Sequence, residues 1–423
     1  MNHNSLHGQR REKGICLRYR FHLYCNGRRT QRRPRQRRPP APDRWRKDCE
    51  RMKNHMQLPK SGKAALFVEP NQPFQLKEYP LSQPQKGEAL LKISASGVCG
   101  TDVHIWRGRL PQNTPLVIGH EFLGEIVALP EGYGECSCHS CDLKVGDQVV
   151  YVAAIPCGEC LLCRTGDSAN CVNFRVSFAR DPEEAPYFFG GFAQYSYAPL
   201  GNLIKLPEGI DPLAAAAFPC AGPTDIHAFK LGGVFDGCAR KVDTAVVQGL
   251  GPVGLFAVLW LASQGVRNVV AVVRGTSPVR MEYAKAFGAT AVVTTDEAEE
   301  YIRSVSREGL GADLAVEASG NPKAFLQGLS LLRNRGTYLV PGQYSNSGSV
   351  ALEPQMITFK ALNIVGSSQF DASDAADYLS FLDRNRQLLP QIRKIVAAYP
   401  LEEVNQAMAA AEQLTAGKVV LTF

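Results

Sequence analysis

The chain has 423 residues, of which 45 % are hydrophobic, and a formal net charge of +7. This length and composition suffice for about two or three globular domains with ordinary cores. The longest apolar stretch near the middle, residues 252–262, is far short of the roughly 20 residues that span a bilayer, so we expect a soluble chain without a membrane segment.

Residues 1–51 carry the positive charge. They hold sixteen Lys and Arg against four acids, a local +12, which leaves −5 of the total +7 to residues 52–423. Residues 28–40 alone contain seven arginines and three prolines, too polar a segment to bury a core. We therefore predict a disordered basic extension over residues 1–55, with Met52 or Met56 as an alternative true start. The functional alternatives are a nucleic-acid arm or a targeting peptide.

The next part of the chain, from Lys63, predicts an all-β region. Short strand-like runs alternate there with turns, at residues 64–68, 89–94, 124–129, 148–152 and 191–197. After about Asp211 the rhythm changes to strand, glycine turn and helix, which is typical of βαβ units with a parallel sheet.

Strands of this second kind are expected at residues 244–248, 268–273, 291–294, 313–317, 336–340 and 361–366. Helices at 373–385 and 401–412 precede a closing strand at 418–423. We infer two domains with hinges near Pro219 and Gly366: residues 56–218 with 367–423, and residues 219–366.

Four cysteines within fifteen residues follow the spacing C-x2-C-x2-C-x7-C: Cys157, Cys160, Cys163 and Cys171. Short loops can bring four thiolates to the corners of a tetrahedron, and such a zinc site is coordinatively full and therefore structural. Disulfides are the competing interpretation. The sequence shows no signal peptide before the cluster, and an intracellular chain keeps its thiols reduced, so we favour zinc and a cytoplasmic location.

A glycine motif follows the strand at 244–248 and opens a helix: Gly249, Gly251 and Gly254 in the pattern G-x-G-x-x-G. In that context the glycines allow a tight turn and close approach of a pyrophosphate, while the helix N-terminus favours its negative charge. The alternative is a glycine turn without a ligand.

The acidic residue that usually binds the adenosine ribose of NAD, about 20 positions further on, is missing. The second strand instead ends at Arg274, which with Thr276, Ser277 or Arg280 offers groups for the 2′-phosphate of NADP. We therefore favour NADP over NAD. The competing interpretation makes Arg274 a solvated residue at a strand end.

Three further segments carry metal-ligand types: residues 97–104 with Cys99, residues 119–121 with His120, and residues 219–224 with Cys220. Two thiolates and one imidazole make three protein ligands, and catalytic zinc sites keep the fourth position for water or substrate. Taken singly, each residue is more typical of a packed histidine or an inert buried thiol. Their joint occurrence with the other two motifs favours a metal site.

With these motifs the chain, from about Lys63 to Phe423, resembles the zinc-containing medium-chain dehydrogenase/reductase family. The resemblance also rests on residues 190–193, Gly-Gly-Phe-Ala, and on the ending Gly417-Lys418-Val-Val-Leu. It implies a GroES-like β-rich catalytic domain with the structural zinc lobe, over 56–218 and 367–423, and a Rossmann domain over 219–366. It implies an alcohol dehydrogenase that transfers hydride between an alcohol and NADP or NAD, giving an aldehyde or ketone.

The resemblance further implies the roles of individual residues. Cys99, His120 and Cys220 would bind the catalytic zinc, with Asp102 and Glu121 as supporting carboxylates. Thr101 would take the hydroxyl proton and pass it through the ribose to His104, which titrates near neutrality. Thr224 would contact the nicotinamide and Lys418 the cofactor phosphates. Two zinc ions per chain and a homo-oligomer, dimer or tetramer, are also implied.

Two departures and three alternatives accompany this interpretation. Relatives often carry glutamate at the position of Cys220, and Cys136, Cys138 and Cys141 form a Cys-rich insertion that is either an exposed loop or a further metal site. The alternatives are a zinc-free quinone reductase of the same superfamily, a noncatalytic NADP-binding relative, and a zinc-ribbon nucleic-acid binder. The −5 charge of residues 52–423 disfavours nucleic acid as a partner. The pattern does not choose the alcohol.

Overall fold

The computed structural model describes residues 58–423 except 134–141, 177, 179, 182, 235–241, 276 and 344. The predicted basic extension and the Cys-rich insertion lie outside these residues. Met56–Phe423 forms one compact unit by its internal contacts. The finer division at residues 218/219 and 366/367 stays a prediction.

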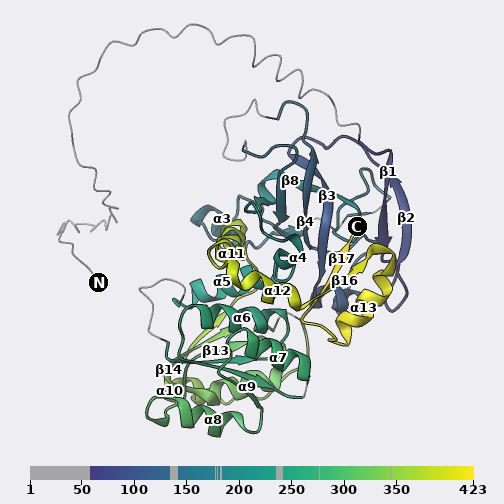
Figure 1. The fold of residues 1–423 in the computed structure, drawn as a ribbon. Coiled ribbons are helices and arrows are strands. Elements are labelled where there is room, and N and C mark those ends of the chain that lie inside the picture. Colours follow the sequence, from purple (N-terminus) through teal and green to yellow (C-terminus); the bar gives the residue numbers. More distant parts are fainter. Residues whose placement is uncertain are drawn as a thin grey trace, which may run out of the picture. The chain divides into compact units, whose positions relative to one another are not determined.

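The first of two large sheets is a mixed sheet whose central strand is β3 (Figure 1). Its order is β16 (Val396–Pro400), β17 (Lys418–Thr422), β3 (Glu88–Val98), β4 (Glu121–Ala128), β5 (Gln148–Tyr151) and β9 (Leu203–Lys205), with β8 (Tyr195–Pro199) also paired to β3. Because β17 pairs antiparallel with β3, with Val420 opposite Gly97, the C-terminal strand returns to the sheet that begins near the other end of the described chain.

Smaller elements surround this sheet. Two hairpin-like pairs join β1 (Ser61–Leu66) to β2 (Gln75–Pro80) and β6 (Ala154–Ile155) to β7 (Arg175–Val176). The α-helices of this part are α2 (Gly100–Trp106), α3 (Leu161–Thr165), α4 (Pro212–Ala215), α11 (Ala372–Arg384), α12 (Leu389–Lys394) and α13 (Val404–Glu412). Short 3₁₀ helices lie at η1 (Ser168–Asn170), η2 (Leu200–Asn202), η4 (Arg386–Leu388) and η5 (Leu401–Glu403).

The second large sheet is parallel throughout, as the βαβ pattern predicts. Its order is β12 (Ala291–Thr294), β11 (Asn268–Val273), β10 (Thr244–Gln248), β13 (Ala312–Glu317), β14 (Leu332–Val340) and β15 (Asn363–Gly366). Numbered along the chain this is 3-2-1-4-5-6, the Rossmann order, in which ligands bind at the carboxyl ends of the strands where the order reverses. Here that point lies between β10 and β13.

Helices cover both faces of the parallel sheet, as Figure 1 shows. On one face pack α5 (Ala221–Leu231), α6 (Pro252–Ser263) and α7 (Pro278–Ala286); on the other pack α8 (Ala298–Val305), α9 (Pro322–Leu331) and α10 (Gln355–Lys360), with η3 (Arg307–Gly309) after α8. Since both faces are covered, the middle of the central strand is apolar: Ala245, Val246 and Val247 of β10 are all fully buried.

None of the described helices is long and apolar enough to cross a membrane. The fold is thus a GroES-like β-rich part joined to a Rossmann sheet, the class that the sequence indicates.

Candidate active site: two thiol clusters and a glycine loop

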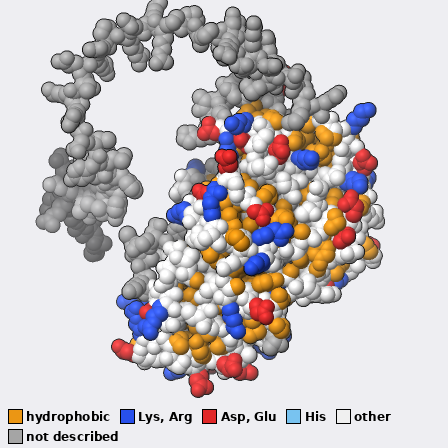
Figure 2. All heavy atoms as spheres, viewed as in Figure 1, with side chains coloured by type: hydrophobic (Ala, Val, Ile, Leu, Met, Phe, Trp, Pro, Cys, Tyr) orange, Lys and Arg blue, Asp and Glu red, His pale blue; other side chains and the backbone are white. Residues whose placement is uncertain are grey.

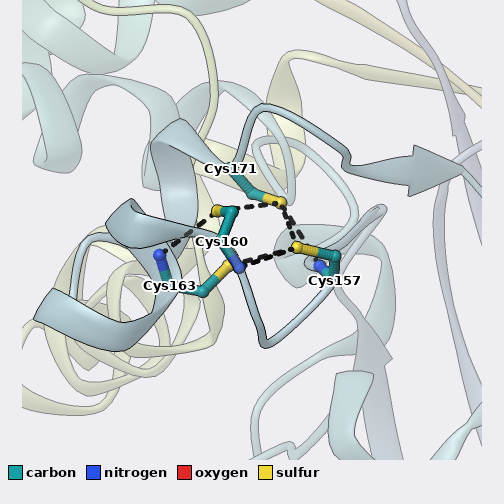
Figure 3. A group of neighbouring side chains, drawn as sticks. All are labelled: Cys157, Cys160, Cys163 and Cys171. Carbon is teal, nitrogen blue, oxygen red and sulfur yellow. Dashed lines mark hydrogen bonds between the residues drawn. The ribbon is translucent and has the colours of Figure 1, made fainter.

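The four predicted structural ligands converge in a loop cluster (Figure 3). Cys160 is the N-cap of α3, Cys163 lies inside that helix, and Cys171 follows η1. The sulfur of Cys157 lies 3.5 Å from that of Cys171 and 4.0 Å from that of Cys163, and the sulfurs of Cys160 and Cys171 are 3.9 Å apart. A tetrahedron with Zn–S bonds of about 2.3 Å has edges of about 3.8 Å. The four sulfurs therefore fit a zinc ion.

Backbone N–H groups support negative charge on these sulfurs. The N–H of Cys160 donates to the sulfur of Cys157 at 3.4 Å, and the N–H of Cys163 donates to that of Cys160 at 3.5 Å. Bonds from the backbone of Cys163 and Val172 lower the pKa of Cys160 to about 6. Burial and the neighbouring sulfurs raise the pKa of Cys163 to about 12. Without a cation, negative charge on one sulfur thus disfavours deprotonation of its neighbours. A divalent cation would neutralise that charge.

A second cluster lies deeper in the molecule. Ligand atoms of Cys99, His120, Glu121 and Cys220 all lie within 4.8 Å of one another. Cys99 directly follows β3 and is the N-cap of α2, His120 precedes β4, and Cys220 is the N-cap of α5. The fold thus brings together the three residues that the sequence predicts as catalytic-zinc ligands, from elements far apart in the chain.

Asp102 orients two members of this cluster. Its side chain is fully buried, and its Oδ2 accepts the backbone N–H of Cys99 at 2.8 Å. Its Oδ1 lies 3.4 Å from Nδ1 of His120, and neither of these two atoms has a hydrogen bond in the described residues. A ring held on its Nδ1 side presents Nε2 to a metal, which is the usual arrangement of carboxylate, histidine and zinc.

The pKa values of Cys99, Cys220 and His120 are shifted because the three side chains interact closely, and a bound cation would take the place of the protons that they share. The hydrogen bond from Cys220 holds the pKa of Cys99 well below its usual range, and the same bond raises the pKa of Cys220. Burial lowers the pKa of His120, but the carboxylate of Asp102 and the Cys99 thiolate outweigh it and raise that pKa well above its usual range. Two thiols and an imidazole in contact are borderline ligands typical of zinc, and they leave one of four positions open.

Glu121 and Lys418 form a buried ion pair beside this cluster. The Lys418 ammonium contacts Oε2 of Glu121, and both side chains are 1 % exposed. Burial raises the pKa of Glu121 to about 7, against the opposing effect of Lys418. Gly97 leaves space for the pair, since a Cβ there would lie 2.8 Å from Cε of Lys418. The predicted contact of Lys418 with cofactor phosphates stays a prediction, and in this structure its partner is Glu121.

The predicted proton relay begins next to Cys99. The Oγ1 of Thr101 lies 3.8 Å from the sulfur of Cys99, and His104 follows three residues later on α2, which places both on one face of the helix. His104 is half-buried, and burial together with the charge of Arg109 lowers its pKa below the ordinary value. Proton passage between Thr101 and His104 stays a prediction.

The glycine loop has the geometry that its motif predicts. Gly249 adopts φ +89°, and a Cβ on Gly254 would collide with the carbonyl oxygen of Gly249, so helix α6 approaches the end of β10 closely. Gly251 is the N-cap of α6, and space is open around the position of its missing Cβ. The amino end of α6 is thus accessible to a phosphate.

Arginine side chains near this loop differ in their availability. Arg274 is exposed at the end of β11. Arg280 is buried, and its guanidinium donates to the carbonyls of Leu250 at 2.9 Å and Ala416 at 3.0 Å. Of the four groups suggested for a 2′-phosphate, Arg280 is therefore engaged with backbone carbonyls, and Thr276 lies outside the described residues. Arg274 and Ser277 remain as candidates.

The sequence analysis missed Glu317, which organises the carboxyl edge of the parallel sheet. Its Oε1 accepts the N–H and the hydroxyl of Ser319, at 2.8 and 2.5 Å, and the N–H of Gly320 at 3.0 Å, while Oε2 accepts from Gln343 at 3.0 Å. The signal was available, because an acid at the end of a buried strand needs hydrogen-bonding partners. Thr224, the predicted nicotinamide contact, lies half-buried one turn after Cys220 on α5.

Comparisons with known proteins identify two family domains in this chain. Residues 85–208 match the model of the alcohol dehydrogenase GroES-like domain, and residues 252–384 that of the zinc-binding dehydrogenase. The 5-exo-hydroxycamphor dehydrogenase of Pseudomonas putida is 30 % identical over 367 residues, 85 % of this chain and 97 % of that protein.

Two solved structures extend the comparison. An alcohol dehydrogenase from Thermotoga maritima has a TM-score of 0.76 and 31 % identity, covering 86 % of this chain and 99 % of that one. A short chain alcohol dehydrogenase (rspB) from E. coli CFT073, complexed with the cofactor NADH, has a TM-score of 0.71 and 28 % identity, with coverage of 86 % and 100 %.

Proposed function

Because this chain belongs to the zinc-containing medium-chain dehydrogenase/reductase family, we propose that it moves a hydride between an alcohol and NAD(P), giving an aldehyde or a ketone. The observation that carries the proposal is the cluster of Cys99, His120 and Cys220, three ligands of the right chemistry that leave one position for substrate. When bound, zinc would polarise the substrate C–O bond as a Lewis acid, and the nicotinamide would exchange the hydride.

The residues of the chain orient the reactants and move the proton. Thr101 would accept the hydroxyl proton of the alcohol, and His104, one turn later on α2, would receive the proton at the end of the relay. The lowered pKa of His104 keeps its imidazole neutral, and so able to accept a proton, at physiological pH. Asp102 holds the ring of His120 and the backbone of Cys99 in place. Thr224 would contact the nicotinamide.

Arg274 supports NADP as the preferred nucleotide. It is exposed at the carboxyl end of β11, where other dinucleotide-binding chains carry a carboxylate for the ribose, and a guanidinium binds a phosphate well. Arg274→Ala should raise the KM for NADP by about tenfold to a hundredfold, the effect of one charge-assisted bond, and leave that for NAD nearly unchanged. Arg267→Ala is the matched control, since Arg267 lies exposed just before the amino end of the same strand.

The alternatives receive less support. A zinc-free reductase or a noncatalytic relative has no use for two complete sets of zinc ligands. The matching family model and the relative from Pseudomonas putida are also both described as dehydrogenases. A nucleic-acid binder presents a basic surface, whereas acidic and basic side chains are interspersed on the face drawn in Figure 2. A cytoplasmic location and a homodimer or homotetramer stay predictions.

Zinc analysis combined with an alcohol panel tests the proposal. Two zinc ions per chain are expected, with turnover of at least one primary, secondary, cyclic or polyhydroxy alcohol in the presence of NAD or NADP. The relative in Pseudomonas putida is named a 5-exo-hydroxycamphor dehydrogenase, which makes 5-exo-hydroxycamphor the first alcohol to try. Full turnover by a preparation free of zinc would contradict the mechanism.

A further inference from the structure

The four-thiolate lobe, which carries Cys157, Cys160, Cys163 and Cys171, contacts the amino end of helix α11 through Ser168. Ser168 lies between Cys163 and Cys171, at the start of η1, so its position is determined by the loop that carries the sulfurs. Its hydroxyl donates to Oδ2 of Asp371 at 2.8 Å. Asp371 is the N-cap of α11, and its Oδ1 accepts the backbone N–H of Ser373 at 2.8 Å. The lobe thus holds the carboxylate that begins this helix.

The same carboxylate is connected to helix α5. The N–H of Asp371 donates to Oδ2 of Asp374 at 3.0 Å, which completes a capping box. Asp374 is 1 % exposed, and its carboxylate also contacts α5: Nδ1 of His227 at 3.0 Å and the ammonium of Lys230 at 2.7 Å. Lys230 also reaches Asp377, one turn further along α11, at 2.6 Å. Ionic and hydrogen-bonded contacts therefore fasten α5 to the first turns of α11.

Helix α5 begins with a residue of the cluster of Cys99, His120 and Cys220, called the open cluster here because three ligands leave one position of a zinc ion free. Its N-cap is Cys220, and Cys220 packs against a small apolar group formed by Val152, Phe370 and Ala375. Phe370 directly precedes Asp371, and Ala375 directly follows Asp374. The two helices are also in close contact, since a Cβ on Gly222 would lie 2.5 Å from the ring of Tyr378. A displacement of the start of α11 would therefore be expected to reach Cys220.

We propose that the four-thiolate lobe positions the open metal cluster through the chain Ser168, Asp371 and Asp374. In this arrangement Ser168 is a positioning residue: it sets the start of α11, which holds α5 and with it Cys220 and Thr224. The lobe then serves the geometry of the reactive site as well as its own stability. The assignment of Cys220 as a ligand rests on the proposed function.

Ser168→Ala tests the chain, and Ser373→Ala is its matched control. Each variant removes one serine hydroxyl from the carboxylate of Asp371, but Ser168 belongs to the lobe whereas Ser373 is an exposed residue of α11 itself. Ser168→Thr keeps the hydroxyl and should restore the contact. The readout is the rate at which zinc loss to a chelator exposes thiols to an alkylating reagent, with mass spectrometry to separate Cys99 and Cys220 from the four lobe cysteines.

In the zinc-loaded protein we expect Ser168→Ala to speed alkylation of Cys99 and Cys220 about fivefold, the effect of one hydrogen bond, and to lower kcat similarly. Ser373→Ala and Ser168→Thr should resemble the unchanged protein. Equal rates in Ser168→Ala and the unchanged protein, or an equal increase in Ser373→Ala, would overturn the proposal. Because alkylation needs no substrate, the link stands or falls separately from the dehydrogenase activity: an active enzyme with unaltered alkylation refutes the link alone.

Discussion

The two thiol clusters are built in opposite ways. The four-thiolate cluster comes from one fifteen-residue segment, and its sulfurs receive backbone N–H groups of their own loop. The open cluster joins residues from 99 to 220, is bordered by a buried carboxylate and a buried ion pair, and leaves one position free. The first is a local device that is complete in itself. The second cluster depends on the whole fold, because residues from distant segments surround it. Those residues can therefore change the charge on its ligands.

Removing a ligand of the open cluster should have the largest effect. We expect Cys99→Ser to lower kcat by at least about a thousandfold, because the metal supplies several kcal/mol of charge stabilisation in the reaction. Nucleotide affinity should remain within about twofold, since the glycine loop is built independently on β10 and α6. Steady-state kinetics and a fluorescence titration with NADPH measure the two quantities. If a variant that has lost this zinc keeps its turnover, the open cluster has no catalytic role that distinguishes it from the structural one.

Removing a ligand of the closed cluster should act on stability first. Cys160→Ser should weaken metal binding in the lobe by more than the ten- to hundredfold typical of residues that only support ligands, and lower the unfolding temperature. The effect on kcat should be much smaller than that of Cys99→Ser and should reflect the displaced α11. Calorimetry with zinc analysis tests this. A lobe stripped of metal that unfolds at an unchanged temperature would contradict its structural role.

The same contrast explains how much of the molecule the sequence predicts. The lobe and the glycine loop are local patterns, so their spacing alone indicates their chemistry, and the alternation of strands and helices predicts the parallel sheet. Cys99, His120 and Cys220 are separated by long segments. Their residue types favoured a metal site, and the resemblance assigned the catalytic zinc to them, but only the structure brings the three together. Contacts set by tertiary packing, such as Ser168 with Asp371, leave no pattern in the sequence.

The partner of Lys418 is another product of tertiary packing. Resemblance predicts a phosphate contact, whereas the structure pairs Lys418 with Glu121 inside the β-rich part. Lys418→Met should cost about 3 kcal/mol of unfolding free energy, because it leaves a buried carboxylate without its cation. The double variant with Glu121→Gln should recover most of that loss. Urea unfolding measures the cost, and a nucleotide affinity weakened equally in both variants would favour the phosphate role.

The smallest expected effect concerns the pH dependence of the open site. Burial, and then the positive charge of Arg109, lower the pKa of His104 below its ordinary value of 6.5. Alcohol oxidation through His104 needs the neutral imidazole, so the rate should rise with pH through a value below 6.5. Arg109→Gln removes the charge that disfavours imidazolium, so this pKa, and with it the acidic limb of the pH–rate profile, should move to higher pH.

Arg107→Gln is the control for that measurement, because the guanidinium of Arg107 is already paired with Glu412 at 2.7 Å and does not act on His104. The limb should keep its position in Arg107→Gln and disappear in His104→Gln, as followed by kcat/KM between pH 5 and 9. A limb that persists unchanged in His104→Gln would assign the proton to another group. The open cluster would then keep its proposed metal chemistry, but His104 would have no part in proton transfer. The two clusters would differ only in their ligand sets.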